Sequence, residues 1–148
     1  MIIEKIPKEK FAVLHKDLDK EGFECLQSSK IDDIYDYIEK GDSIRYVKKG
    51  TFLPPEMEIK FAKDELDDLQ LATRKKLAFT GLDVWFSSIE INIAFKEELL
   101  RSDKDMEDAK HLRIIYKDEI NENEIADIKK LIRKLRLREE RKKFEDER

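Results

Sequence analysis

The 148-residue chain has little of several residue types that mark common protein classes. It contains one cysteine, four glycines and three prolines, which excludes a disulfide-stapled scaffold, a collagen-like repeat and a flexible linker. No apolar run approaches the roughly 18 residues that a membrane-spanning helix needs, and the first residues, MIIEKIPKEK, lack the apolar segment of a signal peptide. With Cys25 as the single thiol, a reducing, cytoplasmic compartment is the expected location.

Histidine and the common catalytic signatures are scarce as well. The two histidines, His15 and His111, lie far apart in predicted helices. The sequence has no Walker A loop and no GxGxxG, GxSxG, CxxC or HExxH motif. Metal sites built on histidine and cysteine are therefore not expected.

Charge, by contrast, is abundant and unevenly distributed. The chain has 31 Lys and Arg against 35 Asp and Glu, which gives a net charge of −4. Residues 129–148 carry ten basic and five acidic side chains, and the rest of the chain carries 21 basic and 30 acidic ones. Such an acidic body is a poor general ligand for nucleic acid, whose phosphates bind mainly Lys and Arg. The basic segment either follows an RNA backbone or an acidic partner, or it complements the chain's own acidic body.

Apolar periodicity and capping residues predict most of the chain to be helical. A helix begins at Pro7 and ends at Gly22, because proline suits a first helical turn and glycine a left-handed stop. Ser28 or Ser29 is expected to cap a second helix that ends near Gly41. Further helices are predicted over 64–76, from a capping box at Ser87 and Glu90 to Leu99, from Ser102 with Asp105 to Tyr116, and over 123–137.

Four short strands are predicted between these helices, over 23–26, around Ile44 and Tyr46, over 57–62 and over 82–86. The middle two form a hairpin, with a turn at Lys49-Gly50 and with Leu53-Pro54-Pro55 in the connection. The fold class is therefore α+β, with a small mixed or antiparallel sheet of about four strands closed by C-terminal helices. Residues 1–120 are assigned to one domain and residues 121–148 to a basic C-terminal helix and tail.

The most specific stretch of sequence is 82–116, LDVWFSSIEINIAFKEELLRSDKDMEDAKHLRIIY. A predicted strand leads into a helix of the form hxxEhxhAxK and then into a K-D-x-x-D motif. The residues at these motif positions are Ile89, Glu90, Ile93, Ala94, Lys96, Lys104, Asp105, Asp108 and Leu112. This order resembles the nucleotidyltransferase-like proteins of archaea and bacteria, and the resemblance extends over roughly residues 3–117.

The resemblance implies an incomplete nucleotidyltransferase-like fold and transfer of a nucleoside monophosphate from a nucleoside triphosphate. Such a transfer uses two Mg²⁺ ions held by three carboxylates. The residues that it assigns are Glu58 as catalytic residue and metal ligand, and Lys60, Lys104, Asp105 and Asp108 as nucleotide-binding residues.

The family's glycine-rich turn and Asp-x-Asp strand have no counterpart ahead of Pro7. Asp17-Leu18-Asp19 lies in a predicted helix, where side chains two residues apart point in different directions and cannot share a metal. The expected protein is therefore truncated or degenerate and inactive as this chain, and it is an enzyme only if a longer N-terminus supplies the Asp pair.

Two other functions stay open at this point. One is a protein-interaction module, either a toxin–antitoxin-type partner or a homodimer, that uses an exposed sheet edge and the C-terminal helices. The other is an RNA-binding protein that uses residues 129–148. For the assigned residues the plainer alternatives are a surface pair of Glu58 with Lys60, and a solvated Lys104 beside a capped helix start.

Overall fold

The computed structural model describes residues 1–50, 56–77 and 81–146, and of residues 139–146 it describes the backbone. The chain divides into two compact units, Met1–Leu71 and Ala72–Arg148, which are described separately. The predicted domains, 1–120 and 121–148, were assigned from the family resemblance and the charge distribution rather than from packing. They stay a prediction beside this structural division.

The first unit is a four-stranded sheet with helices. Its elements are β1 (Ile2–Ile3), α1 (Lys8–Lys20), β2 (Phe23–Cys25), α2 (Ile31–Glu39), β3 (Ile44–Lys48), β4 (Glu56–Phe61) and most of α3 (Glu65–Ala72). The strand order is β1-β4-β3-β2. β1 runs parallel to β4, whereas β3 is antiparallel to both of its neighbours. This mixed sheet confirms the predicted α+β class and the predicted hairpin of β3 with β4.

The helix boundaries in this unit largely follow the sequence signals. Pro7 directly precedes α1, and Gly22 follows it with a φ of 82°, a conformation that glycine adopts without strain. The predicted serine cap of α2 is wrong, because the N-cap residue is Lys30 and no side chain caps it. Ser28 instead accepts a hydrogen bond from the Lys30 amide and donates one to Asp33, which forms a turn ahead of the helix.

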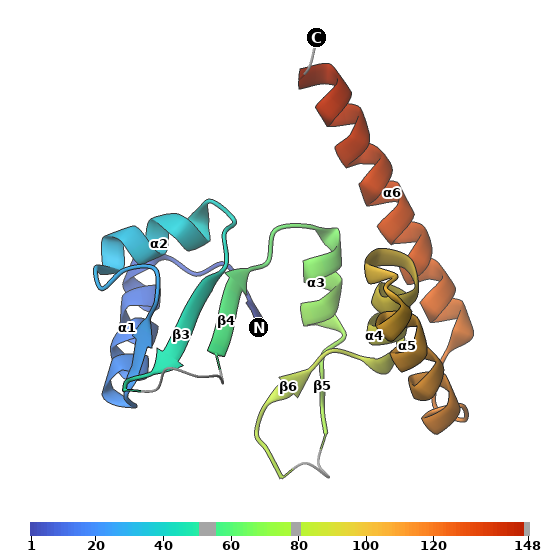
Figure 1. Ribbon diagram of the computed structural model, residues 1–148, viewed down its shortest axis with the longest axis horizontal. Helices are drawn as coiled ribbons and strands as arrows, with labels where there is room; N and C mark the ends of the chain where they lie inside the picture. The colour runs from blue at the N-terminus through green and yellow to red at the C-terminus, as the bar shows by residue number, and fades with distance from the viewer. Residues whose placement is uncertain (51–55, 78–80, 147–148) are drawn as a thin grey trace. The chain divides into compact units, whose positions relative to one another are not determined.

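Both α1 and α2 pack on the same face of the sheet (Figure 1). Phe11 of α1 lies fully buried between Tyr35 of α2 and Phe61 of β4, with ring centroids 5.7 and 6.1 Å away. The remaining buried members of this core are Ile34, Ile38, Ile44, Tyr46 and Ile59. Because side chains alternate along a strand, the other face of β3 and β4 carries charged residues.

The fourth predicted strand does not join this sheet. β6 (Trp85–Phe86) pairs antiparallel with β5 (Lys75–Lys76) in a separate two-stranded sheet, and β1 is the fourth strand of the larger one. The helix predicted over 64–76 accordingly ends at Ala72. The connection expected at Leu53-Pro54-Pro55 lies outside the described residues, as does Thr80 of the expected turn before residue 82.

After β6, the second unit consists of helices that pack against one another. They are α4 (Ile89–Ala94), the π-helix η2 (Phe95–Leu100), α5 (Asp103–Ile115) and α6 (Glu122–Asp146), and Figure 1 shows α6 as a long helix, which packs against α4 and η2. Their buried apolar side chains are Ile91, Ile93, Ala94, Ala109, Ile125, Ile128 and Ile132. Within the described residues, we find no helix with the length and apolar character needed to cross a membrane.

Candidate functional site

The residues assigned from the family resemblance fall in both units. Glu58 and Lys60 lie on β4 of the first unit, and Lys104, Asp105 and Asp108 lie on α5 of the second. Each group is described within its own unit.

Glu58 lies on the charged face of β4, exposed, and opposite Arg45 of β3 in the strand register. Lys60 does not pair with Glu58. Its ammonium donates instead to both carboxylate oxygens of Asp67 on α3, at 3.0 and 3.3 Å. Asp67 is 4% exposed and also accepts a hydrogen bond from the Lys63 amide. Lys60 therefore neutralises a buried carboxylate that holds the start of α3 against β4.

The surroundings of Glu58 do not fit a pair of Mg²⁺ ions. The second carboxylate on this strand face, Glu56, lies 3.6 Å from the guanidinium of Arg45, and a positive group at that place opposes a bound cation. Among the described residues no three His, Cys, Asp or Glu side chains come together as a metal site. The assignment of Glu58 as a metal ligand stays a prediction from the resemblance.

In the second unit, three motif residues do come together. Lys96 of η2 donates to Asp108 at 2.8 Å and to Asp105 at 3.3 Å, so that η2 is tied to the start of α5. The hydrogen bond to Asp108 raises the pKa of Lys96, and the same bond lowers the pKa of Asp108. Asp105 also bonds the hydroxyl of Ser102, the predicted cap of α5, and that bond is the main reason why its pKa is lowered. The neighbouring Lys104 is exposed.

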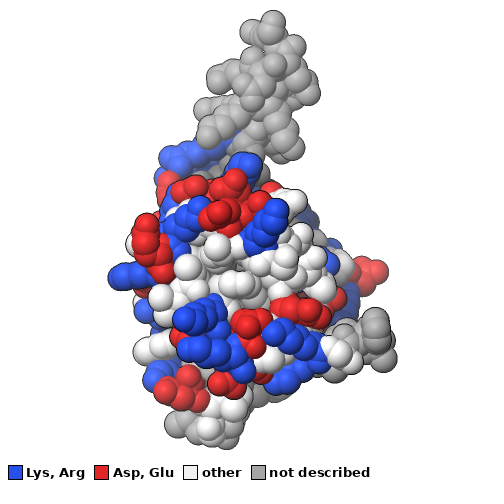
Figure 2. Space-filling view, turned by 90° about the vertical axis from the view of Figure 1, so that its left-hand side faces the viewer, with Lys and Arg blue, Asp and Glu red and all other residues white. Residues whose placement is uncertain are grey.

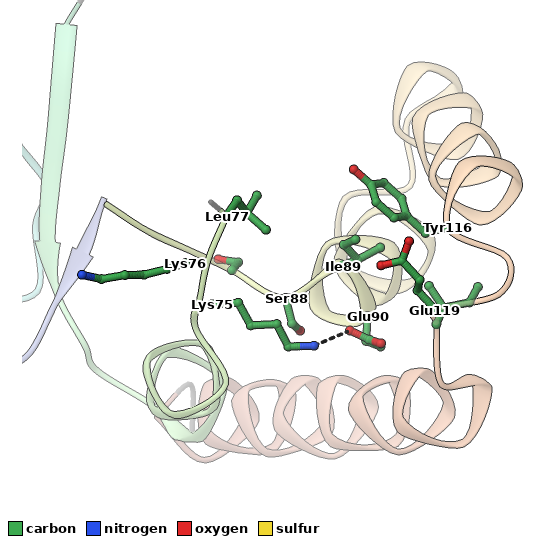
Figure 3. A pocket seen from close by; sticks show the side chains of 10 residues that line it. Lys75, Lys76, Leu77, Ser88, Ile89, Glu90, Tyr116 and Glu119 are labelled. Atoms are coloured by element: carbon green, nitrogen blue, oxygen red, sulfur yellow. Dashed lines mark ion pairs between the residues drawn. The ribbon is translucent and has the colours of Figure 1, made fainter. Parts of the chain in front are cut away.

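A cavity of about 300 Å³ lies in the same unit. Figure 3 shows it between the strand that carries Lys75, the start of α4 and the end of α5. Its volume lies at the lower end of the range of about 300–1,000 Å³ that small-ligand sites occupy. The lining residues are Lys75, Lys76, Leu77, Ser87, Ser88, Ile89, Glu90, Tyr116, Glu119 and Ile120.

Glu90 is the buried polar group of this cavity. Its side chain is the motif carboxylate of the helix, and the residue is only 4% exposed. The Oε1 atom accepts a hydrogen bond of 3.3 Å from the Asn121 amide. The buried Oε2 atom has no hydrogen-bond partner in the described part of the chain, and the nearest cation, the Lys75 ammonium, is 4.0 Å away. A buried carboxylate oxygen without a donor is costly, which makes it a candidate for a ligand contact.

The other charged side chains at the cavity are more exposed. Lys76 points away from the cavity in Figure 3, and it forms an ion pair with Asp83 and lies over the ring of Trp85, 5.1 Å from its centre. Glu119 lines the cavity from the segment after α5 and is exposed. Lys75 and Glu90 are therefore the donor and the acceptor that lie nearest to each other at this site.

The cap of α4 differs from the predicted one. Ser88, not Ser87, is the N-cap residue, and its hydroxyl accepts a hydrogen bond of 3.2 Å from the Ile91 amide. The predicted capping box is therefore wrong, since Glu90 is the second helical residue and its side chain turns into the cavity rather than back to the cap. The S-x-x-E spacing favours Ser87, whereas the observed cap is the adjacent Ser88.

We expect Ser88→Ala to destabilise the second unit by about 1 kcal/mol, because the Ile91 amide loses its acceptor at a buried helix start. Urea denaturation followed by circular dichroism measures this loss. The matched control is Ser87→Ala, which should change the free energy of unfolding by less than about 0.5 kcal/mol. Equal losses from both substitutions would contradict the assignment of the cap.

Several basic side chains of residues 129–138, the part of the basic segment whose side chains are described, form ion pairs or hydrogen bonds within the second unit. Lys129 bonds Glu97 at 2.5 Å, Arg133 bonds Glu98 at 2.9 Å, and Arg136 donates to the Leu99 carbonyl at 2.5 Å. These contacts agree with the alternative that the segment complements the chain's own acidic groups.

The helix face of the first unit is also mixed in charge. Figure 2 shows basic and acidic side chains interspersed on the face that carries α1 and α2. Ion pairs such as Lys8 with Asp32, at 2.7 Å, and Lys49 with Asp19, at 2.6 Å, are typical of it. Such a surface lacks the single sign of charge that attracts a nucleic-acid backbone.

Of the two histidines, His15 has a structural partner. Its Nδ1 atom lies 2.7 Å from the hydroxyl oxygen of Tyr46, which is 1% exposed. Burial raises the pKa of Tyr46, so this phenol stays protonated and able to donate. His15 thus satisfies a buried hydroxyl at the edge of the core.

The sequence contained a signal for Glu90 as a site residue. Glu90, Ile93 and Ala94 share one face of α4, and all three are buried, so the carboxylate interrupts an apolar stripe at helical spacing. Lys75 gave no such signal, because it belongs to a two-residue strand that was predicted as helix. No match was found when the chain was compared with family models, curated proteins and solved structures.

Proposed function

We propose that the protein is a nucleotidyltransferase-like protein that binds a nucleoside triphosphate without transferring the monophosphate as this chain. The observation that carries the proposal is the cavity of the second unit, where a buried carboxylate with one oxygen that accepts no hydrogen bond from the described residues lies among apolar walls. Pockets of this make-up, mostly apolar with few polar groups, are typical of small-molecule sites.

The family-like sequence supports this proposal because two of its motif residues, Ile89 and Glu90, line the cavity. Glu90 lines it directly, and Lys96 ties η2 to Asp105 and Asp108 at the start of α5. Tyr116, which follows α5, lines the side of the cavity across from Lys75 (Figure 3). Asp105 and Asp108 do not line the cavity, so in this proposal they have a positioning role and hold η2 to the start of α5.

The surroundings of Glu58 support the proposed absence of transfer. In-line phosphoryl transfer needs carboxylates that hold two metal ions against the attacking and leaving oxygens. Beside Glu58, however, Lys60 is bound to Asp67, and Arg45 lies near Glu56. Mg²⁺ then accompanies the bound nucleotide and is not held by β4.

The other two functions have weaker support. RNA binding by residues 129–148 would compete with the contacts of Lys129 and Arg133 to Glu97 and Glu98. A homodimer or another protein partner would use an edge strand, β1 or β2, of the larger sheet.

Equilibrium dialysis of the 148-residue chain with α-labelled nucleoside triphosphates and Mg²⁺ tests the proposal. We expect saturable binding, with no label incorporated into protein, RNA or DNA in a parallel assay. Glu58→Ala serves as the matched variant, and it should leave binding unchanged.

Two results would contradict the proposal. Incorporation that is lost in Glu58→Ala would show an active transferase with Glu58 at its centre. A failure of every nucleoside triphosphate to bind at millimolar concentration would remove nucleotide binding altogether.

A further inference from the structure

The cavity of the second unit presents one hydrogen-bond acceptor and one donor side by side. The acceptor is Glu90 Oε2, which is buried and has no donor among the described residues. The donor is the Lys75 ammonium, 4.0 Å away, which is too far for a hydrogen bond but within the range of an ion pair. Figure 3 shows the two side chains directed toward each other at the cavity.

The walls around this pair favour a flat apolar body. Leu77 and Ile89 line the cavity near the lysine strand and the start of α4, and Tyr116 and Ile120 line it from the end of α5. A ring between these walls gains apolar contact on both faces. Its edge would then meet the acceptor and the donor together.

We propose that this cavity binds a nucleobase by an amino group next to a ring nitrogen, the edge that adenine and cytosine share. The amino group donates to Glu90 Oε2, and the neighbouring ring nitrogen accepts from Lys75. The inference rests on the proposed nucleotide binding and names the part of the nucleotide that is recognised.

The same pair of side chains disfavours two other ligand classes. A metal ion at Glu90 would lie close to the Lys75 ammonium, which repels it, and a single carboxylate binds hard cations weakly. An organic ammonium group would meet the same repulsion. A neutral ring with one donor and one acceptor satisfies both side chains without adding charge.

Pairs of nucleotides that differ in this edge test the inference. Adenosine and inosine triphosphates differ in an amino group against a carbonyl, and cytidine and uridine triphosphates differ in the same way. In a fixed pose the carbonyl forms face Glu90 with an acceptor and Lys75 with an N–H donor. We expect the full chain to bind the amino member of each pair about tenfold more tightly in equilibrium dialysis.

Glu90→Gln is the decisive variant. Its Oε1 atom can still accept from the Asn121 amide, which leaves the amide nitrogen, a donor, where Oε2 was. The preference for the amino nucleotides should therefore be abolished while the protein remains folded. Circular dichroism and a thermal melt check the fold.

Lys75→Met provides a second variant that does not depend on a buried group, since the Lys75 side chain is 64% exposed. It removes the donor to the ring nitrogen, and we expect it to reduce the same preference severalfold. Glu107→Gln is the matched control, an exposed carboxylate on α5 that does not line the cavity. It should leave all four affinities within about twofold of the wild type.

The outcomes separate this inference from the proposed function. Equal affinity for both members of each pair, or a preference retained in Glu90→Gln, would overturn the inference and leave nucleotide binding in place. If none of the four nucleotides binds, the proposed function fails and the inference fails with it.

Discussion

Phe11→Ala is expected to destabilise the first unit by about 3–5 kcal/mol and to leave the second unit intact. The Phe11 ring is fully buried and contacts the rings of Tyr35 and Phe61, so its removal opens a cavity at the centre of the core. The two units have separate buried clusters, and we therefore expect the loss to stay within Met1–Leu71.

Hydrogen exchange read by mass spectrometry measures this effect unit by unit. Amides of residues 1–71 should exchange about a hundredfold faster or more in Phe11→Ala, whereas those of residues 89–137 should keep their rates. Nucleotide binding in the second unit should likewise be retained. Val13→Ala is the matched control on α1, because Val13 is 60% exposed and its loss should cost less than about 0.5 kcal/mol. Equal loosening of both units would show that the chain unfolds as a whole.

The sequence predicted the elements of the first unit because each is marked by local signals. α2 has Ile34, Tyr35 and Ile38 at helical spacing, and all three are buried as predicted. Glycines with positive φ follow both helices, at Gly22 and Gly41. Periodicity and stop residues act within a few positions along the chain, so a single sequence is enough to find them.

Pairing of short strands was not predictable in the same way. β1, β5 and β6 have two residues each, too few for an alternating pattern to identify their partners. Lys75 and Lys76 are both charged, so they show no alternation of apolar and polar residues, and they follow a helix. Only their antiparallel pairing with β6 makes them a strand. Their contacts are therefore set by tertiary packing rather than by local preference.

The π-helix η2 is a second departure that depends on tertiary contacts. The pattern through Leu99 predicted one α-helix. In the structure the helix changes to the wider π-helix over Phe95–Leu100 and ends at Arg101, which has a positive φ of 59°. Within this turn Glu97 and Glu98 face basic residues of α5 and α6. The sequence placed Lys96 in one motif and Asp105 and Asp108 in the next, and the ion pairs between them became visible only in the structure.

The loss of stability caused by Glu97→Gln is expected to depend strongly on pH. Arg113 donates to both Glu97 carboxylate oxygens, at 2.7 and 3.0 Å, and Lys129 bonds the same carboxylate. Hydrogen bonding to Arg113 is the main cause that lowers the pKa of Glu97 to about 2, from 4.5. Its side chain is 14% exposed, and a shift of this size corresponds to about 3 kcal/mol of stability. We expect Glu97→Gln to cost about 2–3 kcal/mol at pH 7, because it leaves two cations facing a neutral amide.

The sign of the pH dependence follows from the lowered pKa. Above about pH 4.5 the carboxylate is ionised in both the folded and the unfolded chain, and the stabilisation is complete. Between about pH 4.5 and pH 2 the unfolded chain takes up the proton first, so the stabilisation is lost as the pH falls. The difference in unfolding free energy between the wild type and Glu97→Gln should therefore shrink over this range in urea denaturation.

Glu107→Gln on α5 is the matched control, since Glu107 is exposed and should give a small difference at every pH. A difference for Glu97→Gln that stays constant from pH 7 to pH 3 would show that the side chain acts through packing. A difference that shrinks as the pH falls would show that the charge of Glu97 stabilises the contacts of η2 with α5 and α6.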